Sequence, residues 1–226
     1  MGPGAGGNST SIFFAGGGGG FGGSGGDATI ELEQIVKSKT DTPSNTTARG
    51  GKPYGTALNR NRLQGGSGGA GGEGGGTTIG ASGPGGAGGA GGGAIKLTAT
   101  RDIIIHGTIL ANGGNGTGFR RTGGGGSGGM IVLHAEGVVK LTTTARISAN
   151  GGRGGDCAWM GANGGGGRIL ISGERLIVGQ SDLPPGTVSS SSQFSASGGR
   201  GGYYAVDAIN NAAKGTDGTL FFNELD

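Results

Sequence analysis

The sequence predicts an all-β or irregular fold: a layered, solenoid-like repeat of short β-strands alternating with polyglycine-II helices, and almost no α-helix. Three observations support this prediction. Glycine accounts for 64 of the 226 residues, the glycine tracts keep a three-residue period, and short runs of alternating apolar residues follow the tracts. We expect a single glycine-rich repeat body over residues 1–226.

The glycine tracts repeat two glycines followed by a third residue. Residues 65–76 read GGSGGAGGEGGG, and the same period recurs over residues 16–27 and 85–93. A helix of the polyproline-II type has three residues per turn and no internal hydrogen bonds. Such a tract presents two bare faces to its neighbours and one outward side chain, so adjacent tracts must satisfy each other's backbone groups. A flexible, disordered spacer, which this composition otherwise favours, has no reason to keep the period.

Strand signals follow the tracts at regular intervals. The apolar alternation repeats from Ile95 to Ile131 to Ile169, spacings of 36 and 38 residues, which indicates a stacked array of about five imperfect layers. We expect first strands at residues 28–32, 94–97, 130–133, 168–171 and 219–222, second strands at 103–105, 138–141 and 176–178, and third strands within 107–114, 145–152 and 194–199.

Two segments break this period. Residues 37–64 and 180–193 are predicted loop insertions at the surface, where recognition would be placed. Residues 205–213 are the one stretch in which we expect a short helix. Asn112 and Asn150, each followed by two glycines, are predicted turn residues, because Asn-Gly tolerates positive φ.

The repeat units resemble a known kind of protein. GGGAIKLTATRDIIIHGTILANGGNG and GGGGSGGMIVLHAEGVVKLTTTARISANGGRG resemble glycine-rich repeats of large bacterial surface proteins and phage tail-fibre proteins, and TDGTLFFNELD looks like a closing strand of such segments. The architecture is similar to the polyglycine-II domains of phage tail-fibre tip adhesins and to the glycine-rich ectodomain of the anaplastic lymphoma kinase family. The resemblance covers residues 85–226 and, more weakly, 16–34. It implies an extracellular or virion-surface scaffold with variable loops for binding.

Motifs for catalysis, cofactors and metals are not recognisable. Windows matching G-x-G-x-x-G are expected by chance at this glycine content, and none sits in a strand–loop–helix frame. His106 and His134 occupy different repeat positions, and Cys157 is the single cysteine. Neither histidine lies in a hydrolase motif. We therefore predict a protein that is not an enzyme, with no cofactor and no metal.

Charge and hydropathy limit the classes of partner and the cellular locations that we expect for this protein. The formal charge is +3 with no block of like charges, so we expect no nucleic acid; Arg153 and Arg200 of the Arg-Gly-Gly sequences fall in the outward slot of a triplet. No apolar run is long enough to span a bilayer. The N-terminus lacks the features of a Sec signal peptide. We expect an extracellular, cell-surface or virion location.

Candidate recognition residues come from the aromatic and basic residues at the breaks in the repeat. These are Trp159, Tyr203, Tyr204, Tyr54, Arg60 and Arg62. Exposed aromatic side chains would stack on sugars or anchor a partner, whereas buried ones would plug the layered core. The sequence leaves both alternatives open for Trp159 and for Tyr203 and Tyr204.

The predicted function is therefore structural or adhesive: a subunit or tip of a fibre or filament that associates with itself or with other fibre subunits. An alternative is a receptor-recognition module that binds a cell-surface glycan or protein through its loops. Ice binding and RNA binding of the RGG type are weaker alternatives. The sequons at Asn8, Asn45 and Asn115 matter only in a eukaryotic secretory pathway.

Overall fold

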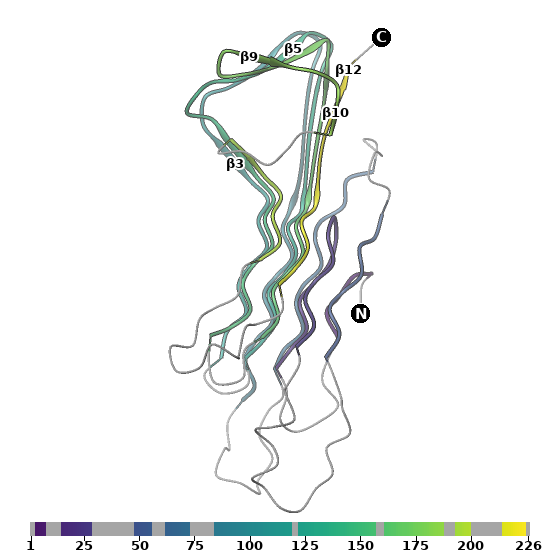
Figure 1. Cartoon of the computed structure of the whole chain (residues 1–226), viewed down its shortest axis with the longest axis vertical. Coiled ribbons are helices and arrows are strands. Elements are labelled where there is room, and N and C mark those ends of the chain that lie inside the picture. The colour runs from purple at the N-terminus through teal and green to yellow at the C-terminus, as the bar shows by residue number, and fades with distance from the viewer. Residues whose placement is uncertain are drawn as a thin grey trace, which may run out of the picture.

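The computed structural model describes residues 3–7, 15–28, 48–55, 62–72, 84–118, 122–156, 161–187, 193–199 and 214–224. The molecule is elongated, with sheets at one end of its long axis and glycine tracts running along the other (Figure 1). In the described ranges the secondary structure is β-strand with no helix, so the predicted all-β class is confirmed. Residues 205–213, where a short helix was predicted, lie outside these ranges.

The described residues form twelve strands: three successive sets of three, β1 to β3, β4 to β6 and β7, β8 and β11, together with β9, β10 and β12. They are β1 (Ala94–Ala99), β2 (Ile103–Ile105), β3 (Thr108–Leu110), β4 (Met130–Ala135), β5 (Val138–Leu141), β6 (Arg146–Ser148), β7 (Arg168–Gly173), β8 (Arg175–Val178), β9 (Ser181–Leu183), β10 (Gly186–Thr187), β11 (Phe194–Ser195) and β12 (Thr219–Glu224). Four of the five predicted first strands are confirmed as β1, β4, β7 and β12, and the second and third strands also form where predicted. Most of the fifth, at residues 28–32, lies outside the described ranges.

The strands build three sheets. Their orders are β1-β4-β7-β12-β10, β2-β5-β8-β9 and β11-β6-β3. Pairing is parallel except for β9 and β10, which run antiparallel to β8 and β12, so two of the sheets are mixed. The sheets are open at their edges and form neither a closed barrel nor a continuous solenoid. Strands β9 and β10 lie within the segment 180–193, which the sequence marks as an insertion.

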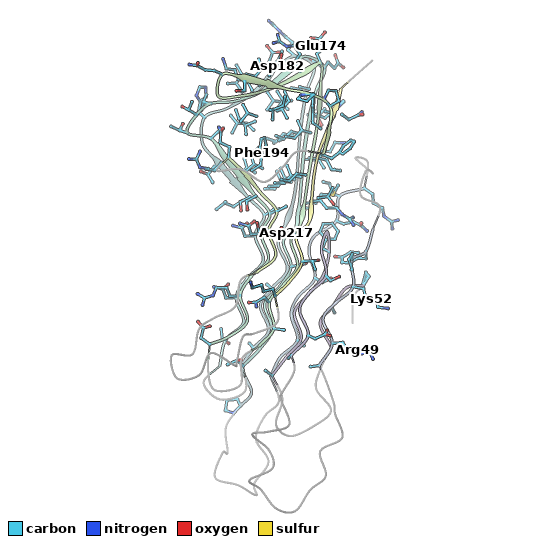
Figure 2. All side chains as sticks on the ribbon, viewed as in Figure 1. Arg49, Lys52, Glu174, Asp182, Phe194 and Asp217 are labelled. Atoms are coloured by element: carbon cyan, nitrogen blue, oxygen red, sulfur yellow. The ribbon has the colours of Figure 1, made fainter. Side chains whose placement is uncertain are left out.

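The apolar core lies between the three sheets, where matching residues of successive strands share one register. One column of residues in register crosses the five-stranded sheet and consists of Leu97, Leu133, Ile171 and Phe222. A second column, in the three-stranded sheet, consists of Ile109, Ile147 and Phe194. Figure 2 shows Phe194 inside the space that the sheets surround, and shows that side chains crowd the sheets and are sparse along the tracts. Period-two apolar patterning therefore specifies which face of each strand is buried.

The outer face of the five-stranded sheet carries a second, smaller cluster. Phe21 is fully buried there against Met130, Val132 and Leu170, and Tyr54 packs on its edge. Because this sheet is apolar on both faces, it needs cover on both. The chain between residues 15 and 55 supplies part of the outer cover.

Glycine tracts fill the other half of the molecule, and their hydrogen bonds run between tracts in steps of three residues. Gly66, Gly69 and Gly72 donate to the carbonyls of Gly92, Gly89 and Gly86, which defines an antiparallel pair. The tracts are residues 3–7, 15–20, 23–28, 48–52, 62–72, 84–93, 111–118, 122–129, 149–156, 161–167, 196–199 and 214–218.

The tract 122–129 has hydrogen-bonded neighbours on all sides. Successive amides of this tract donate in turn to tracts 111–118, 62–72 and 161–167. Its carbonyls accept from three further tracts, 15–20, 84–93 and 149–156. Every residue from 122 to 129 is buried, so the backbone of the tract is satisfied by other backbone rather than by water.

Three tracts, which we call the tract ring, bond one another in a closed cycle. Tract 15–20 donates to 122–129, which donates to 161–167, which donates back to 15–20, with N···O distances of 2.8–3.0 Å. The bonded pairs advance together along each chain, so the three tracts are mutually parallel, and all three are buried along their length. A Cβ on Gly124 would overlap the carbonyl oxygen of Gly17. Glycine is therefore required here by close packing of the backbone.

Asn112 and Asn150 do not have the backbone conformation that the sequence predicted. In the described ranges no residue other than glycine has positive φ. The Asn112 Oδ1 instead accepts from the amide of Asn150 at 2.8 Å, and the Asn150 Oδ1 accepts from the amide of Ser197 at 2.8 Å. These side chains tie neighbouring strand sets together where the strands end, which is the physical reason for Asn at both positions.

Candidate functional site

The structure describes two of the six predicted recognition residues, Tyr54 and Arg62. Tyr54 is half-buried, its ring centroid lies 4.9 Å from that of Phe21, and its hydroxyl donates to the Gly65 carbonyl at 2.6 Å. Arg62 is exposed. Trp159, Tyr203, Tyr204 and Arg60 lie outside the described residues. The structure therefore gives Tyr54 a packing role, and it does not bring Tyr54 and Arg62 together in a described site.

Some of the titratable groups in the described ranges make local contacts. The His134 Nδ1 lies 2.8 Å from the Ser172 Oγ across the β4–β7 pair, and His106 is exposed on the turn after β2. Arg153 is exposed, as its place in a triplet predicted, and pairs with Asp156 at 3.2 Å. Across the described ranges, no three His, Cys, Asp or Glu side chains lie close enough together to hold a metal ion. Within those ranges no helix has the length and apolar character of a membrane span.

Arg168, at the start of β7, is a buried cation that fastens two parts of the chain. Its Nη2 donates to the carbonyls of Phe21 and Gly55, both at 3.3 Å, and its Cζ lies 4.7 Å from the Phe21 ring centroid. Burial lowers the pKa of the Arg168 guanidinium, and an electrostatic interaction with Tyr54 opposes that shift. The Nε is buried without a hydrogen-bond partner. The contacts of Arg168 are therefore cation–π and backbone contacts that hold the outer cover to the sheet.

The best candidate for an interaction surface is the first strand set. β1, β2 and β3 are each the edge strand of their sheet, and we call this edge the open end. An edge strand presents unpaired N–H and C=O groups to whatever lies beside it. Since three consecutive strands form three edges on the same side, these groups make one continuous surface.

The open end is also where apolar side chains are exposed. The large hydrophobic residues exposed in the described ranges are Leu63 (44%), Leu97 (40%), Ile104 (56%) and Leu110 (57%). Leu97, Ile104 and Leu110 come from β1, β2 and β3, one from each. The three-residue steps that pair tract 62–72 with 84–93 place Leu63 level with Ile95. The exposed apolar residues thus gather at one end of the sheets.

Two of these residues replace polar residues of the covered sets. Leu110 lies in register with Ser148 and Ser195, and Ile104 with Lys140, Ile177 and Asp182. An end set that faced water would be expected to be more polar than the sets behind it; at these two positions it is more apolar, whereas Lys96 stands in register with Val132 and Leu170. Lys96 is the one charged residue within β1, β2 and β3.

The opposite edges are built differently. β9, β10 and β11 are the other edge strands of the three sheets, and we call them the hairpin end. Gly179, at φ +64°, begins the two-residue turn that folds β9 back on β8, as glycine does in such turns. Ser181, Asp182, Pro184 and Pro185 are exposed there. Charge, proline and short strands protect an edge from pairing, and the hairpin end has all three.

Comparison with known proteins identifies no relative. No family model matches the chain, and neither the curated proteins nor the solved structures include a match. Any functional conclusion therefore depends on the molecule itself.

The open end was not among the sites predicted from the sequence. Its signal was present in the repeat: aligning the three strand sets places Ile104 over Lys140 and Leu110 over Ser148. Exposure could not be predicted from the sequence, because nothing in the first set says that it forms the edge of the described sheets.

Proposed function

We propose that this protein is a structural or adhesive protein of an extracellular or virion surface, a subunit or tip of a fibre, with a shaft of layered polyglycine-II helices and β-strands. The observation that carries the proposal is the tract ring. It is a buried bundle whose tracts are joined by backbone hydrogen bonds, an arrangement suited to a structural role rather than to catalysis.

The polyglycine-II assignment is supported by the hydrogen-bond pattern. A helix with three residues per turn has no internal hydrogen bonds and directs successive amides to three directions. Tract 122–129 directs its amides to three neighbours in rotation. The layered repeat is supported by the parallel register of β1, β4 and β7, in which matching residues of each set stand side by side.

A structural role is also supported by the polar side chains, several of which connect parts of the scaffold to one another. Arg168 and Tyr54 hold the outer cover on the sheet, and Asn112 and Asn150 join successive strand sets. These groups stabilise the scaffold, which leaves surface loops and sheet edges for contacts with partners. The proposed partners are further copies of this chain or other fibre subunits.

The first test is whether the purified chain is an ordered rod. We expect a circular dichroism spectrum with strand-like and polyproline-like signal, a cooperative thermal transition, and elongated particles by negative-stain microscopy. A disordered spectrum without a transition would contradict the proposed shaft.

The second test addresses location. Antibodies to the purified chain should label intact source cells or virions without permeabilisation. Labelling that requires permeabilisation would overturn the surface role, whatever the shape of the particles.

A further inference from the structure

From the open end we infer that two copies of this chain dock open end to open end about a two-fold axis, with β2 of each copy pairing antiparallel with β2 of the other. This inference rests on the proposed function, because self-association of the chain is part of that proposal, and it specifies how two copies associate. It replaces an open filament by a closed dimer.

The first argument is the contrast between the two ends. Head-to-tail stacking would place the apolar open end against the hairpin end, with its exposed Asp182, Pro184 and Pro185. Open end against open end instead covers the inward-facing Leu97 of each copy with β3 of the other, and sets Ile104 beside Ile104 as a cross-strand pair on the outer face. Burial of apolar area favours the second arrangement.

No backbone hydrogen bond joins a described residue upstream of β1 to the backbone of β1, β2 or β3; tract 62–72 bonds to tracts 84–93 and 122–129. Tracts 15–20 and 23–28 bond to the tracts 122–129 and 161–167 of the second and third sets, and tract 48–52 bonds to these upstream tracts. Phe21 and Tyr54 lie on the outer face of the sheet rather than at its edge. Among the described residues, these segments are therefore placed elsewhere than beside β1, β2 and β3.

The second argument is the path of the first strand set. The chain runs along β1 toward β2 and along β3 away from it, and the sheets of β1 and β3 lie on opposite sides with β2's sheet across the top (Figure 1). A two-fold axis along the long dimension of the molecule would reverse this path. It sets β2 against β2 of the second copy and β1 against β3, with each pair antiparallel. The symmetry thus matches all three edges at once, as an isologous interface requires.

The register of β2 makes the pairing self-complementary. Ile103 and Ile105 are partners of Val139 and Leu141, and the Ile105 carbonyl accepts from the Thr142 amide, so the backbone of Ile104 faces the open side. Antiparallel pairing centred on Ile104 places Ile104 beside Ile104 and Asp102 opposite His106 of the second copy. The Asp102 Oδ1 already accepts from the Val138 amide at 2.8 Å, and its other oxygen is left to accept from an imidazole N–H.

A glycine column gives a further indication. Gly129, Gly167 and Gly218 each precede a first strand, and a Cβ on any of them would overlap a carbonyl oxygen of the preceding set. Gly93 holds the same position before β1, and within 4 Å of its Cβ position there is nothing. Glycine loses more conformational freedom on folding than alanine does, and an empty space at the Cβ position gives no steric reason for glycine there. A backbone from the second copy at this position supplies one.

The test uses the full chain, with Cys157→Ser as background, and measures both mass and cross-linking. Analytical ultracentrifugation should give a dimer, twice the 21.5 kDa of one chain. Ile104→Cys should form a disulfide with the same residue of the second copy under mild oxidation, because the Cα atoms of a hydrogen-bonded antiparallel pair lie about 5.5 Å apart, within the range of a disulfide. Ser181→Cys, on the hairpin end, is the matched control and should stay reduced.

A second variant removes the apolar contact. Ile104→Lys places two like charges side by side on the axis and should weaken the dimer roughly 10- to 100-fold, whereas Ser181→Lys should leave it unchanged. Circular dichroism checks that each variant keeps the folded spectrum and melting behaviour.

Three outcomes would overturn the inference. They are a wild-type chain that is monomeric at tens of micromolar, a dimer whose Ile104→Cys variant does not cross-link, and filaments that cross-link only when Ile104→Cys and Ser181→Cys chains are mixed. A folded, elongated monomer would leave the proposed structural role in place, whereas a disordered chain would remove both.

Discussion

The two ends of the sheets contain the same kinds of strand and treat their edges in opposite ways. At the hairpin end the chain folds back on itself through β9 and β10 and exposes Asp182 and two prolines. At the open end no described strand pairs with the outer edges of β1, β2 and β3, and Leu97, Ile104 and Leu110 are exposed. Under the proposed dimer, the edges without protection among the described residues are the ones that a second copy covers.

The largest expected difference in stability comes from Gly→Ala substitutions at the glycines that precede the first strands. Gly167→Ala forces a Cβ into the Gly129 carbonyl and should cost more than about 4 kcal/mol or abolish folding. Gly93→Ala meets nothing and should change stability by less than about 1 kcal/mol. Urea unfolding followed by circular dichroism, in the Ile104→Lys background to keep the chain monomeric, measures both. Equal losses would mean that the open side is occupied within one chain.

A smaller effect is expected in the inward column of the five-stranded sheet. Leu133 is fully buried and Leu97, its neighbour in register, is 40% exposed. Leu133→Ala should lose about 2–5 kcal/mol of unfolding free energy, and Leu97→Ala about 1 kcal/mol or less in the monomer. Thermal unfolding gives the difference. A Leu97→Ala loss as large as that of Leu133→Ala would show that the monomer already covers β1.

The asparagine ties between strand sets should give a further, smaller difference. Asn150→Ala leaves the Ser197 amide and the Ser195 hydroxyl without their acceptor, and should cost about 1–3 kcal/mol. Asn112→Ala removes the same kind of bonds nearer the open end, where Asn112 is exposed and water can replace them, and should cost less. Hydrogen exchange at the Ser197 and Asn150 amides locates the loss. Unchanged exchange at Ser197 in Asn150→Ala would contradict the role of the bond.

The smallest effect is expected from the ion pair at the hairpin end. The Asp182 Oδ2 lies 2.8 Å from the Arg175 Nε and 2.5 Å from its Nη2, but both side chains are about half exposed. Asp182→Asn should cost about 1 kcal/mol or less, with the difference from wild type shrinking in 1 M salt. The dimer should persist in this variant. Dissociation of the dimer by Asp182→Asn would mean that the hairpin end takes part in assembly.

Sequence patterns identified the strands well and the contacts between tracts poorly. Alternating apolar residues such as Ile131 and Leu133 report directly which face is buried, so the strand positions could be predicted. A glycine triplet carries no comparable information, because every bare face is alike. The partners of tract 122–129 depend on the path of the whole chain, and no feature of GGGGSGG specifies that residues 15–20 lie beside it.

For the candidate sites, too, the sequence predicts what depends on local pattern and does not predict what depends on contacts between distant residues. Tyr54 was predicted as a recognition residue because it lies in an insertion, yet its ring is held by Phe21 and its hydroxyl by the Gly65 carbonyl. Sequence position could not reveal a contact formed across distant parts of the chain. Ile104 and Leu110, in contrast, could have been singled out by comparing the strand sets position by position.

The tract ring has a consequence for how stability depends on temperature. Exposing apolar surface raises the heat capacity of unfolding, by about 0.45 cal/K/mol per Å², and exposing polar surface lowers it, by about 0.26. A half of the molecule whose interior is amide groups, beside a half whose interior is leucine, isoleucine and phenylalanine, brings these contributions into opposition. The curve of free energy against temperature should therefore be flatter than for an ordinary domain of this length, so that chilling weakens the fold less than it weakens most proteins.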